Sequence, residues 1–176
     1  MGITTKRGDD GKTGMYRGPD IAKDDPRIEF NGVLDELSSF LGLALSCIKQ
    51  KKMKEELVSI REDLFVIGTE VVTKARFLGV LKRRIVSEDV SLLEKKIVEF
   101  EDKIKEKIPC FFVSDQGALA GLLNVARSIA RKLERRAVTL SRKKMLNNKQ
   151  ILIYLNRLSD FLFLMAQYCK KGQNVF

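Results

Sequence analysis

The chain has 176 residues, 44% of them hydrophobic, and its formal net charge is +10. This length suits one domain or at most two small ones, and the apolar fraction supports a core without disulfides. The sequence contains no His, which excludes catalytic triads that depend on imidazole and nearly all common zinc sites. The basic balance favours polyanionic partners, but charge alone leaves nucleic acid, nucleotides and an anionic membrane surface open.

The start of the chain and its cysteines indicate the compartment. The opening segment, MGITTKRGDDGKTG, lacks the apolar region of a secretory signal. The sequence contains no run of 18 apolar residues, so we expect no membrane-spanning helix. Cys47, Cys110 and Cys169 are odd in number and far apart, so we expect small buried thiols and no disulfide framework. A reducing compartment, the cytoplasm, fits this pattern best.

Residues 1–30 are polar and rich in turn signals, and we expect an N-terminal arm that is ordered, by itself or by a ligand, but not helical. We place the first helix at Asn31, after Pro26. In TTKRGDDGKTG, Gly permits tight turns that direct N–H groups at a phosphate, while Thr, Lys and Arg add donors. The Gly spacing does not fit the GxxxxGK[ST] phosphate loop. A phosphate cradle and a flexible terminus both remain open.

Apolar residues at helical spacing predict five helices after the arm. They begin at Asn31, Met53, Ser87, Gly117 and Lys149, and the second, fourth and fifth extend to about Lys74, Lys144 and Lys170. Ser87 is expected to cap the third helix, and residues 76–84 form an irregular basic connector. The prediction is an all-α fold, a single domain of residues 1–176 in which 31–176 form a five-helix bundle with ferritin-like, up-and-down packing.

The fourth helix carries a stripe of arginines. Arg127, Arg131 and Arg135 recur every four residues, so that neighbours are offset by only about 40° around the axis, and Glu134 lies on nearly the same face. Arginines in register repel one another unless carboxylates or an anion lie between them, and a guanidinium offers the paired donors that suit phosphate. The pattern fits a solvated face and an anion site equally well.

Polar residues interrupt the apolar fifth helix, where Asn156 and Asp160 are i, i+4 neighbours within YLNRLSDFLFLMAQY. A buried polar group without a partner costs about 1–3 kcal/mol. Two interpretations remain: hydrogen bonds between helices, or Asn156 facing a ligand. Asp35 in the first helix poses the same choice and could pair with an arginine of the stripe.

In chain order, four segments resemble the trimeric five-helix-bundle type of ATP:cob(I)alamin adenosyltransferase. They are TKRGDDGKTG near the start, KDDPRIEFNGVLDELSSFLG at 23–42, VARSIARKLERR at 125–136 and YLNRLSDFLF at 154–163. The resemblance runs through the whole chain and is poorest across 75–110. It implies a cytoplasmic homotrimer that transfers the 5′-deoxyadenosyl group of ATP to the cobalt of reduced cobalamin and releases triphosphate. The ATP sites would lie between subunits.

The resemblance also implies roles for individual residues. Arg127, Arg131 and Asp35 would carry catalysis, with Asp35 pairing with Arg127 across a subunit boundary. Phe111 would crowd the lower face of the corrin and favour four-coordinate cobalt. The implied ATP-binding residues are Thr5, Lys6, Arg7, Gly8, Thr13, Lys23, Arg131, Glu134, Arg135 and Asn156.

Three expectations about partners follow. Mg²⁺ would be held by phosphate oxygens and water, with no ligand assigned to the protein. The cobalt is itself the nucleophile, so the lack of His is no objection. A reductase or a cobalamin-dependent enzyme would be a further partner, whereas nucleic acid and membrane would not.

The chain departs from the family pattern in places. Asn124 stands where His is usual before VAR, Lys132 stands where a second Arg is usual, and FFVSDQG, with Ser114, Asp115 and Gln116, replaces a turn like Pro-Gly-Gly. Lys keeps the charge but loses the bidentate donors of Arg. Two alternatives stay open: a basic helical module that binds nucleic acid, for which no recognisable motif is present, and a catalytically silent ATP sensor with the same fold.

Overall fold

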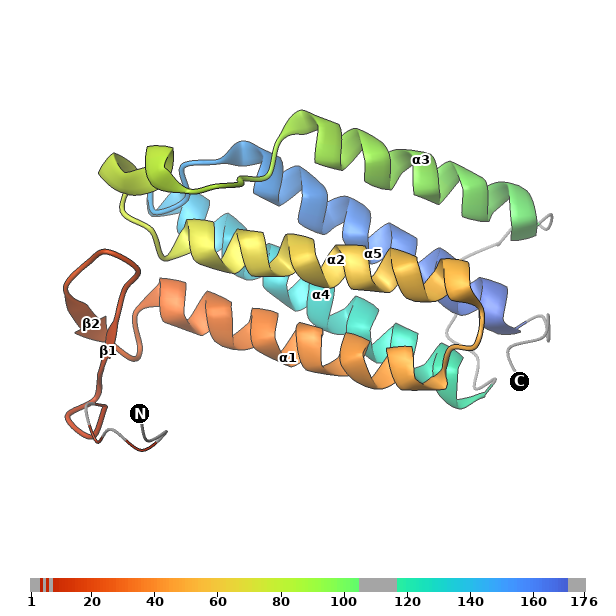
Figure 1. The fold of residues 1–176 in the computed structure, drawn as a ribbon, viewed down its shortest axis with the longest axis horizontal. Helices are drawn as coiled ribbons and strands as arrows, with labels where there is room; N and C mark the ends of the chain where they lie inside the picture. The colour runs from red at the N-terminus through yellow and green to blue at the C-terminus, as the bar shows by residue number, and fades with distance from the viewer. Residues whose placement is uncertain (1–3, 5, 7, 105–116, 171–176) are drawn as a thin grey trace.

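The computed structural model describes residues 4, 6, 8–104 and 117–170, and over these residues the chain is a bundle of long helices with a small hairpin at one end (Figure 1). The α-helices are α1 (Pro26–Cys47), α2 (Lys51–Val71), α3 (Ser87–Ile104), α4 (Ala118–Arg142) and α5 (Lys149–Lys170). The predicted all-α, five-helix fold is therefore confirmed. Helix α1 packs against α2 and α4, α4 packs against α5, and α5 packs against α3.

The core follows from the helical spacing of apolar residues. In α1, the buried residues Phe30, Val33, Leu37, Leu41 and Ala44 recur every three or four positions and form one stripe. Corresponding stripes on the other helices meet it in one continuous apolar cluster. None of the helices in the described part of the chain is both long and apolar enough to cross a membrane.

The ring of Phe100 joins α3 to α5. It meets Phe161 and Tyr168 edge to face, with ring centroids 5.4 and 5.5 Å apart. Such aromatic pairs add to the hydrophobic burial.

Helix α1 begins at Pro26, five residues before the start expected at Asn31, so the boundary between arm and bundle is corrected to this point. Pro is favourable at the first position of a helix because its missing N–H would have no partner there. The preceding residue, Asp25, caps the helix by accepting hydrogen bonds from the backbone N–H of Arg27 and from its guanidinium, at 2.8–2.9 Å. The Arg27 guanidinium lowers the pKa of Asp25.

The arm is not helical, as expected, but it contains a small antiparallel hairpin that the sequence did not indicate. Strand β1 (Lys12–Gly14) pairs with β2 (Asp20–Ala22), with Thr13 opposite Ile21. The turn between the strands is closed by a hydrogen bond from Gly18 N to Met15 O. Gly11, at φ +77°, supplies the left-handed backbone just before β1.

The connector between α2 and α3 is partly helical, because the 3₁₀ segment η1 (Ala75–Val80) overlaps residues 76–84, which were predicted to be irregular. Ser87 is the first residue of α3 and not its cap. Asp89 instead accepts a hydrogen bond from the backbone N–H of Val86, directly before the helix. A carboxylate in the first turn is favourable because it faces unpaired N–H groups.

Helix α4 ends in a left-handed turn at Lys144, which has φ +57°. Met145 N donates to Leu140 O and Lys144 N donates to Ser141 O, which is the paired pattern of a Schellman motif. Gly is the usual residue at this position because a side chain is strained there. A lysine occupies it here.

Candidate functional site

Basic residues of α4 lie on two faces of the helix that differ in their partners. On the face toward α1, Lys132 pairs with Glu36 at 3.0 Å and Arg136 pairs with Glu29 at 3.1 Å. These ion pairs join the two helices at the surface, where each contributes little stability.

The other face of α4 carries Arg127, Arg131, Arg135 and Arg142 within about 80° of one another. Among the described residues, no carboxylate lies within 4.0 Å of these four guanidinium groups. The first three were predicted, and Arg142 extends the stripe toward the arm. We call this set the arginine stripe. Because its charges are not neutralised by carboxylates of the described residues, the structure favours the anion-site interpretation over a face of Glu–Arg pairs.

Arg127 is the most enclosed residue of the arginine stripe. Its Nε is buried and has no hydrogen-bond partner among the described residues. Burial, and secondarily the charge of Arg131, lower the pKa of the Arg127 guanidinium. A desolvated cation beside a second cation is unfavourable unless an anion approaches it. This position therefore favours the approach of a carboxylate or phosphate that is not among the described residues.

Glu134 and Asn156 meet at the edge of the arginine stripe and join α4 to α5. Asn156 Nδ2 donates to Glu134 Oε1 at 3.1 Å, and Asn156 Oδ1 accepts from Arg157 at 3.2 Å. The predicted hydrogen bond between helices is present, and the side chain of Asn156 is exposed, so that the alternative in which it faces a ligand stays a prediction. Glu134 thus presents an oriented carboxylate next to the arginines.

In the arm, Lys23 holds the loop that precedes the hairpin. Its Nζ donates to Gly8 O at 2.7 Å and its backbone N–H donates to Gly11 O at 2.8 Å. Lys6 is exposed and adopts φ +58°, and Thr13 is half-buried in β1. The predicted residues Thr5 and Arg7, and also Phe111, lie outside the described residues.

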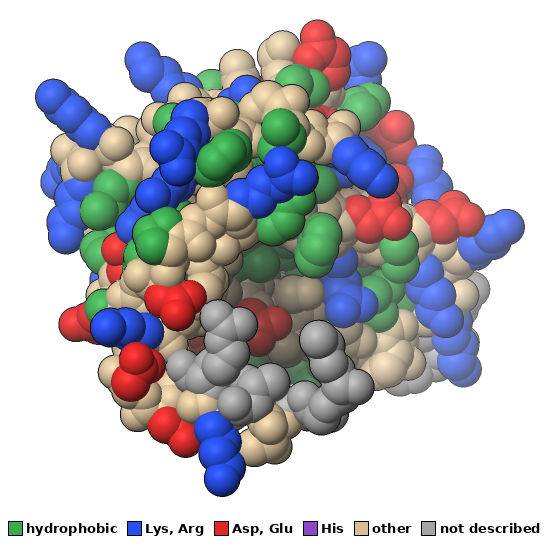
Figure 2. Space-filling model, turned by 60° about the vertical axis from the view of Figure 1, so that its left-hand side comes forward, with side chains coloured by type: hydrophobic (Ala, Val, Ile, Leu, Met, Phe, Trp, Pro, Cys, Tyr) green, Lys and Arg blue, Asp and Glu red, His purple; other side chains and the backbone are tan. Residues whose placement is uncertain are grey.

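Asp35 lies in a hollow of about 300 Å³ between the arm, α1 and α2. Tyr16, Leu34 and Phe65 help to line this hollow, and no ion pair is recorded for Asp35 within the described chain. Phe65 is 75% exposed, which is unusual for a large aromatic side chain. Figure 2, which brings this end of the molecule forward, shows a hollow on this face with both acidic and basic side chains beside it.

The predicted site residues lie in separate groups, which are the arginine stripe with its neighbours, the arm, and Asp35. The described contacts do not join one group to another. Glu134 and Asn156 touch, and Lys23 touches Gly8. No hydrogen bond or ion pair in the described residues links the arm or Asp35 to the arginine stripe.

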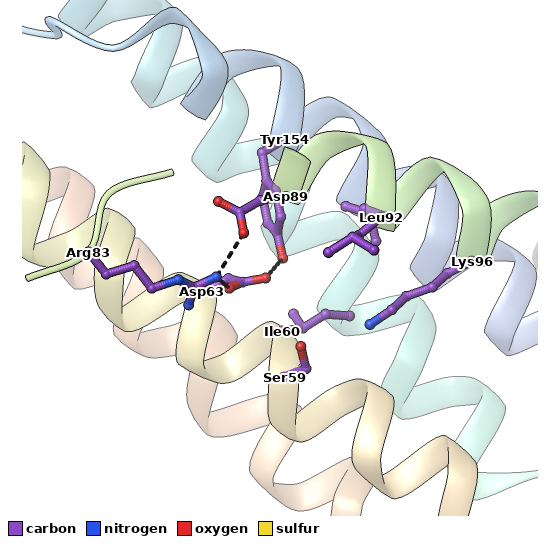
Figure 3. A pocket seen from close by; sticks show the side chains of 9 residues that line it. Ser59, Ile60, Asp63, Arg83, Asp89, Leu92, Lys96 and Tyr154 are labelled. Atoms are coloured by element: carbon purple, nitrogen blue, oxygen red, sulfur yellow. Dashed lines mark hydrogen bonds and ion pairs between the residues drawn. The ribbon is translucent and has the colours of Figure 1, made fainter. Parts of the chain in front are cut away.

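Sequence reasoning missed a buried polar cluster between α2, α5 and the connector (Figure 3). Tyr154 OH donates to Asp63 Oδ2 at 2.6 Å, and Arg83 bridges Asp63 at 2.5 Å and Asp89 at 2.9 Å. Burial, and then the charge of Asp63, raise the pKa of Tyr154 well above its ordinary value. The residues are far apart in the chain, so no local pattern could have identified the cluster. It fixes the connector and the turn of α5 before Asn156.

A second buried carboxylate fastens the same connector. Glu70 is 4% exposed and accepts hydrogen bonds from Arg84, from Ile85 N and from Asn148 Nδ2. Asn148 also donates to Ile85 O at 2.8 Å. These contacts hold the turn before α5 against the end of α2, which gives the exposed site residues of α5 a rigid base.

The described side chains can bind an anion but offer no metal site of their own. No three Asp, Glu or Cys side chains in the described ranges lie close enough to hold a metal ion. A row of guanidiniums with an oriented carboxylate and amide beside it matches a phosphate chain attached to a group with hydrogen-bonding hydroxyls. The protein is all-α, and its candidate site therefore fits a polyanion such as a nucleoside triphosphate.

Comparison with known proteins agrees with this class. The sequence model of the cobalamin adenosyltransferase family matches residues 3–169. The corrinoid adenosyltransferase of Citrobacter freundii is 36% identical, with 94% of this chain and 93% of the relative covered. That of Bacillus subtilis is 35% identical, with 95% and 86% covered.

Solved structures of corrinoid adenosyltransferases are also similar to this chain. A variant PduO-type ATP:corrinoid adenosyltransferase from Lactobacillus reuteri, complexed with cobalamin and ATP, superposes with a TM-score of 0.88 at 32% identity, over 97% of this chain and 94% of the other. Another variant of that type from the same organism, complexed with ATP, gives a TM-score of 0.86. The chain belongs to the cobalamin adenosyltransferase family, and it is an ATP:corrinoid adenosyltransferase.

Proposed function

We propose that this chain transfers the 5′-deoxyadenosyl group of ATP to the cobalt of cob(I)alamin and that Arg127, Arg131 and Arg135 of the arginine stripe form its triphosphate site. The observation that carries the proposal is the contrast between the two faces of α4. The basic residues toward α1 are paired, whereas Arg127, Arg131 and Arg135 are not neutralised by any described residue. Relatives named for this activity support the reaction.

The chemistry needs positive charge where the leaving group develops negative charge. Cobalt(I) donates its electron pair to C5′ of ATP, the C5′–O bond breaks, and triphosphate leaves with the bonding electrons. The charge on the bridging oxygen rises in the transition state, so guanidiniums held near it stabilise that state more than the bound substrate. Arg131, in the middle of the stripe, is placed to do this.

Glu134 and Asn156 orient the nucleoside. The Glu134 carboxylate accepts hydrogen bonds, which suits ribose hydroxyls, and the hydrogen bond from Asn156 fixes its direction. Arg135 flanks the same edge and binds the phosphate chain. Holding C5′ in line with the cobalt lowers the entropic cost of the reaction.

The arm closes over the phosphates. Lys6, Gly8, Thr13 and Lys23 supply donors, and the contact of Lys23 with Gly8 O positions the loop before ATP arrives. Thr5 and Arg7 belong to the same loop by the family resemblance. Mg²⁺ reaches the site on the phosphates, because no described cluster of carboxylates would hold it, and it neutralises part of the triphosphate charge.

The active assembly is a homotrimer with each site shared by two subunits. Arg127 needs an anion, and Asp35 lies unpaired in an open hollow on another face of the same chain. Pairing Asp35 of one subunit with Arg127 of the next satisfies both groups. It also brings the arm of one subunit to the arginine stripe of its neighbour.

Corrinoid binding and location complete the proposal. Phe111 crowds the lower face of the corrin by family resemblance, and a cob(II)alamin reductase or a cobalamin-dependent enzyme docks with the trimer. The enzyme works in the cytoplasm, where a reducing environment suits the free thiols of Cys47 and Cys169.

Product analysis tests the reaction. Purified protein with MgATP and reduced corrinoid under anaerobic conditions should yield adenosylcobalamin and intact triphosphate in equal amounts, measured by mass spectrometry. ADP or pyrophosphate as the main product would contradict the proposal. ATP binding without any transfer would favour the silent-sensor alternative.

Complementation between subunits tests the shared site. Asp35→Asn and Glu134→Gln each disable a different half of the site, so each pure variant should have low activity. Co-expressed, the two variants form mixed trimers in which some sites are intact, and activity should return to a substantial fraction of wild type. Mixed trimers that stay as inactive as the parents would contradict a site built from two subunits.

A further inference from the structure

The arginine stripe is longer than the bound part of a nucleotide needs. Arg127 and Arg142 are 15 positions apart along the helix, which is about 22 Å at 1.5 Å per residue. Arg142 lies seven residues beyond Arg135, two turns along the helix and within about 20° of it. It therefore extends the same row of guanidiniums about 10 Å past the proposed phosphate site, toward the end of the bundle.

The surroundings of Arg142 favour a role for its charge. Helix α4 ends there, at the end of the bundle that carries the arm (Figure 1). The pKa of Asp25, at the base of the arm, is lowered chiefly by its hydrogen bond with Arg27, and the charge of Lys143 adds a smaller effect in the same direction. Arg142, Lys143 and Lys144 are all exposed, and no ion pair is recorded for any of them among the described residues.

Backbone strain at the same point is a second observation. Lys144 occupies the left-handed position of the Schellman turn, where Gly would avoid a cost of about 1 kcal/mol. A cationic residue, Lys144, therefore occupies a position at which Gly would give a more stable protein.

We propose that Arg142, with Lys143 and Lys144 beside it, is an electrostatic entry for MgATP that draws the phosphates along the arginine stripe. This inference rests on the proposed function, because it takes MgATP to be the substrate that binds at the arginine stripe. The role is one of steering: Arg142 raises the rate of productive encounter and does not touch the bound phosphates. It predicts a salt-dependent effect on kcat/KM for ATP with kcat unchanged.

The size of the effect follows from the distance. A unit charge about 10 Å from an anion of charge −2 changes its local concentration roughly threefold at 10 mM ionic strength, and less than about twofold at 0.15 M. Arg142→Gln should lower kcat/KM for MgATP by that threefold factor at low salt, and Arg142→Glu by about sevenfold. Arg142→Lys keeps the charge and should behave like wild type.

Lys54→Glu is the matched control, since Lys54 is an exposed helical lysine at the other end of the bundle with no recorded ion pair. The substitution makes the same change in net charge as Arg142→Glu, but at the other end of the bundle, so the kcat/KM of this variant should stay near wild type. If Arg142→Glu and Lys54→Glu have the same salt dependence, the entry role is wrong.

A helix C-terminus also favours cations through its dipole, so a purely structural role is the competing explanation. In that case Arg142→Glu would lower the melting temperature and leave kcat/KM unchanged relative to the control. If the wild-type protein performs no adenosyl transfer, the proposed function is wrong, but this result does not by itself decide the role of Arg142. The entry is then tested by the association rate of MgATP in stopped flow, where an unchanged rate for Arg142→Glu would overturn it.

Discussion

Arg131→Ala should separate catalysis from stability. Arg131 stands between Arg127 and Arg135, and no described carboxylate lies within 4.0 Å of its guanidinium. If it stabilises the departing triphosphate, its removal should lower kcat by about 10²–10³, as for the loss of one donor to a developing charge. The free protein should not lose stability, because no favourable pair is broken.

The stability change can be worked from the helix geometry. Guanidiniums at i, i+4 are about 8 Å apart, so each like-charge pair costs about 0.5 kcal/mol in water before screening. Arg131 has two such neighbours, and at 0.15 M salt screening leaves about 0.4 kcal/mol in total. Arg131→Ala should therefore be as stable as wild type or about 0.4 kcal/mol more stable in urea unfolding without ATP.

Arg136→Ala is the control on the opposite face of α4. It breaks the pair with Glu29, in which both side chains are about half exposed, and should cost at most about 0.5 kcal/mol while activity is retained. The reasoning is refuted if Arg131→Ala turns over at nearly the wild-type rate, or if it destabilises the protein more than Arg136→Ala does.

Three further outcomes follow from the geometry. Lys144→Gly should raise the free energy of unfolding by up to about 1 kcal/mol, since it removes left-handed strain, and a decrease in urea unfolding would show that the turn is not strained. Cys47 is exposed whereas burial raises the pKa of Cys169 to about 11, so alkylation at pH 8, mapped by mass spectrometry, should modify Cys47 first, and equal rates would contradict the burial of Cys169. The pKa of Tyr154 is raised in the folded state, so above about pH 10 the unfolded chain releases this proton and the folded chain does not. Stability should then fall with rising pH, less steeply in Tyr154→Phe, and identical slopes for the two proteins would count against the buried hydroxyl.

The sequence predicted those parts of the fold that depend on local periodicity. Apolar spacing located all five helices, and the start of α5 at Lys149 agrees with the structure. The start of α1 was misplaced because Pro26 was interpreted as a barrier, whereas after a capping Asp25 it is a favourable first residue. Strands of three residues, such as β1, are too short to show an alternating pattern.

The site was predictable only as a set of residue types. Spacing showed that Arg127, Arg131 and Arg135 share a face, but it could not tell which basic residues of α4 find acids on α1. The answer depends on how α1 and α4 pack. The bond between Tyr154 and Asp63 spans 91 residues and carries no local signal at all.

The central claim is ATP-dependent alkylation of cobalt at the arginine stripe, and an anaerobic spectrophotometric assay tests it most directly. With MgATP and chemically reduced cobalamin, the Co(I) absorption band should give way to the spectrum of adenosylcobalamin over many turnovers per subunit. The same assay with Arg131→Ala should be slower by about 10²–10³. A Co(I) band that persists with wild type while ATP is bound, or equal rates for the two proteins, would contradict the account.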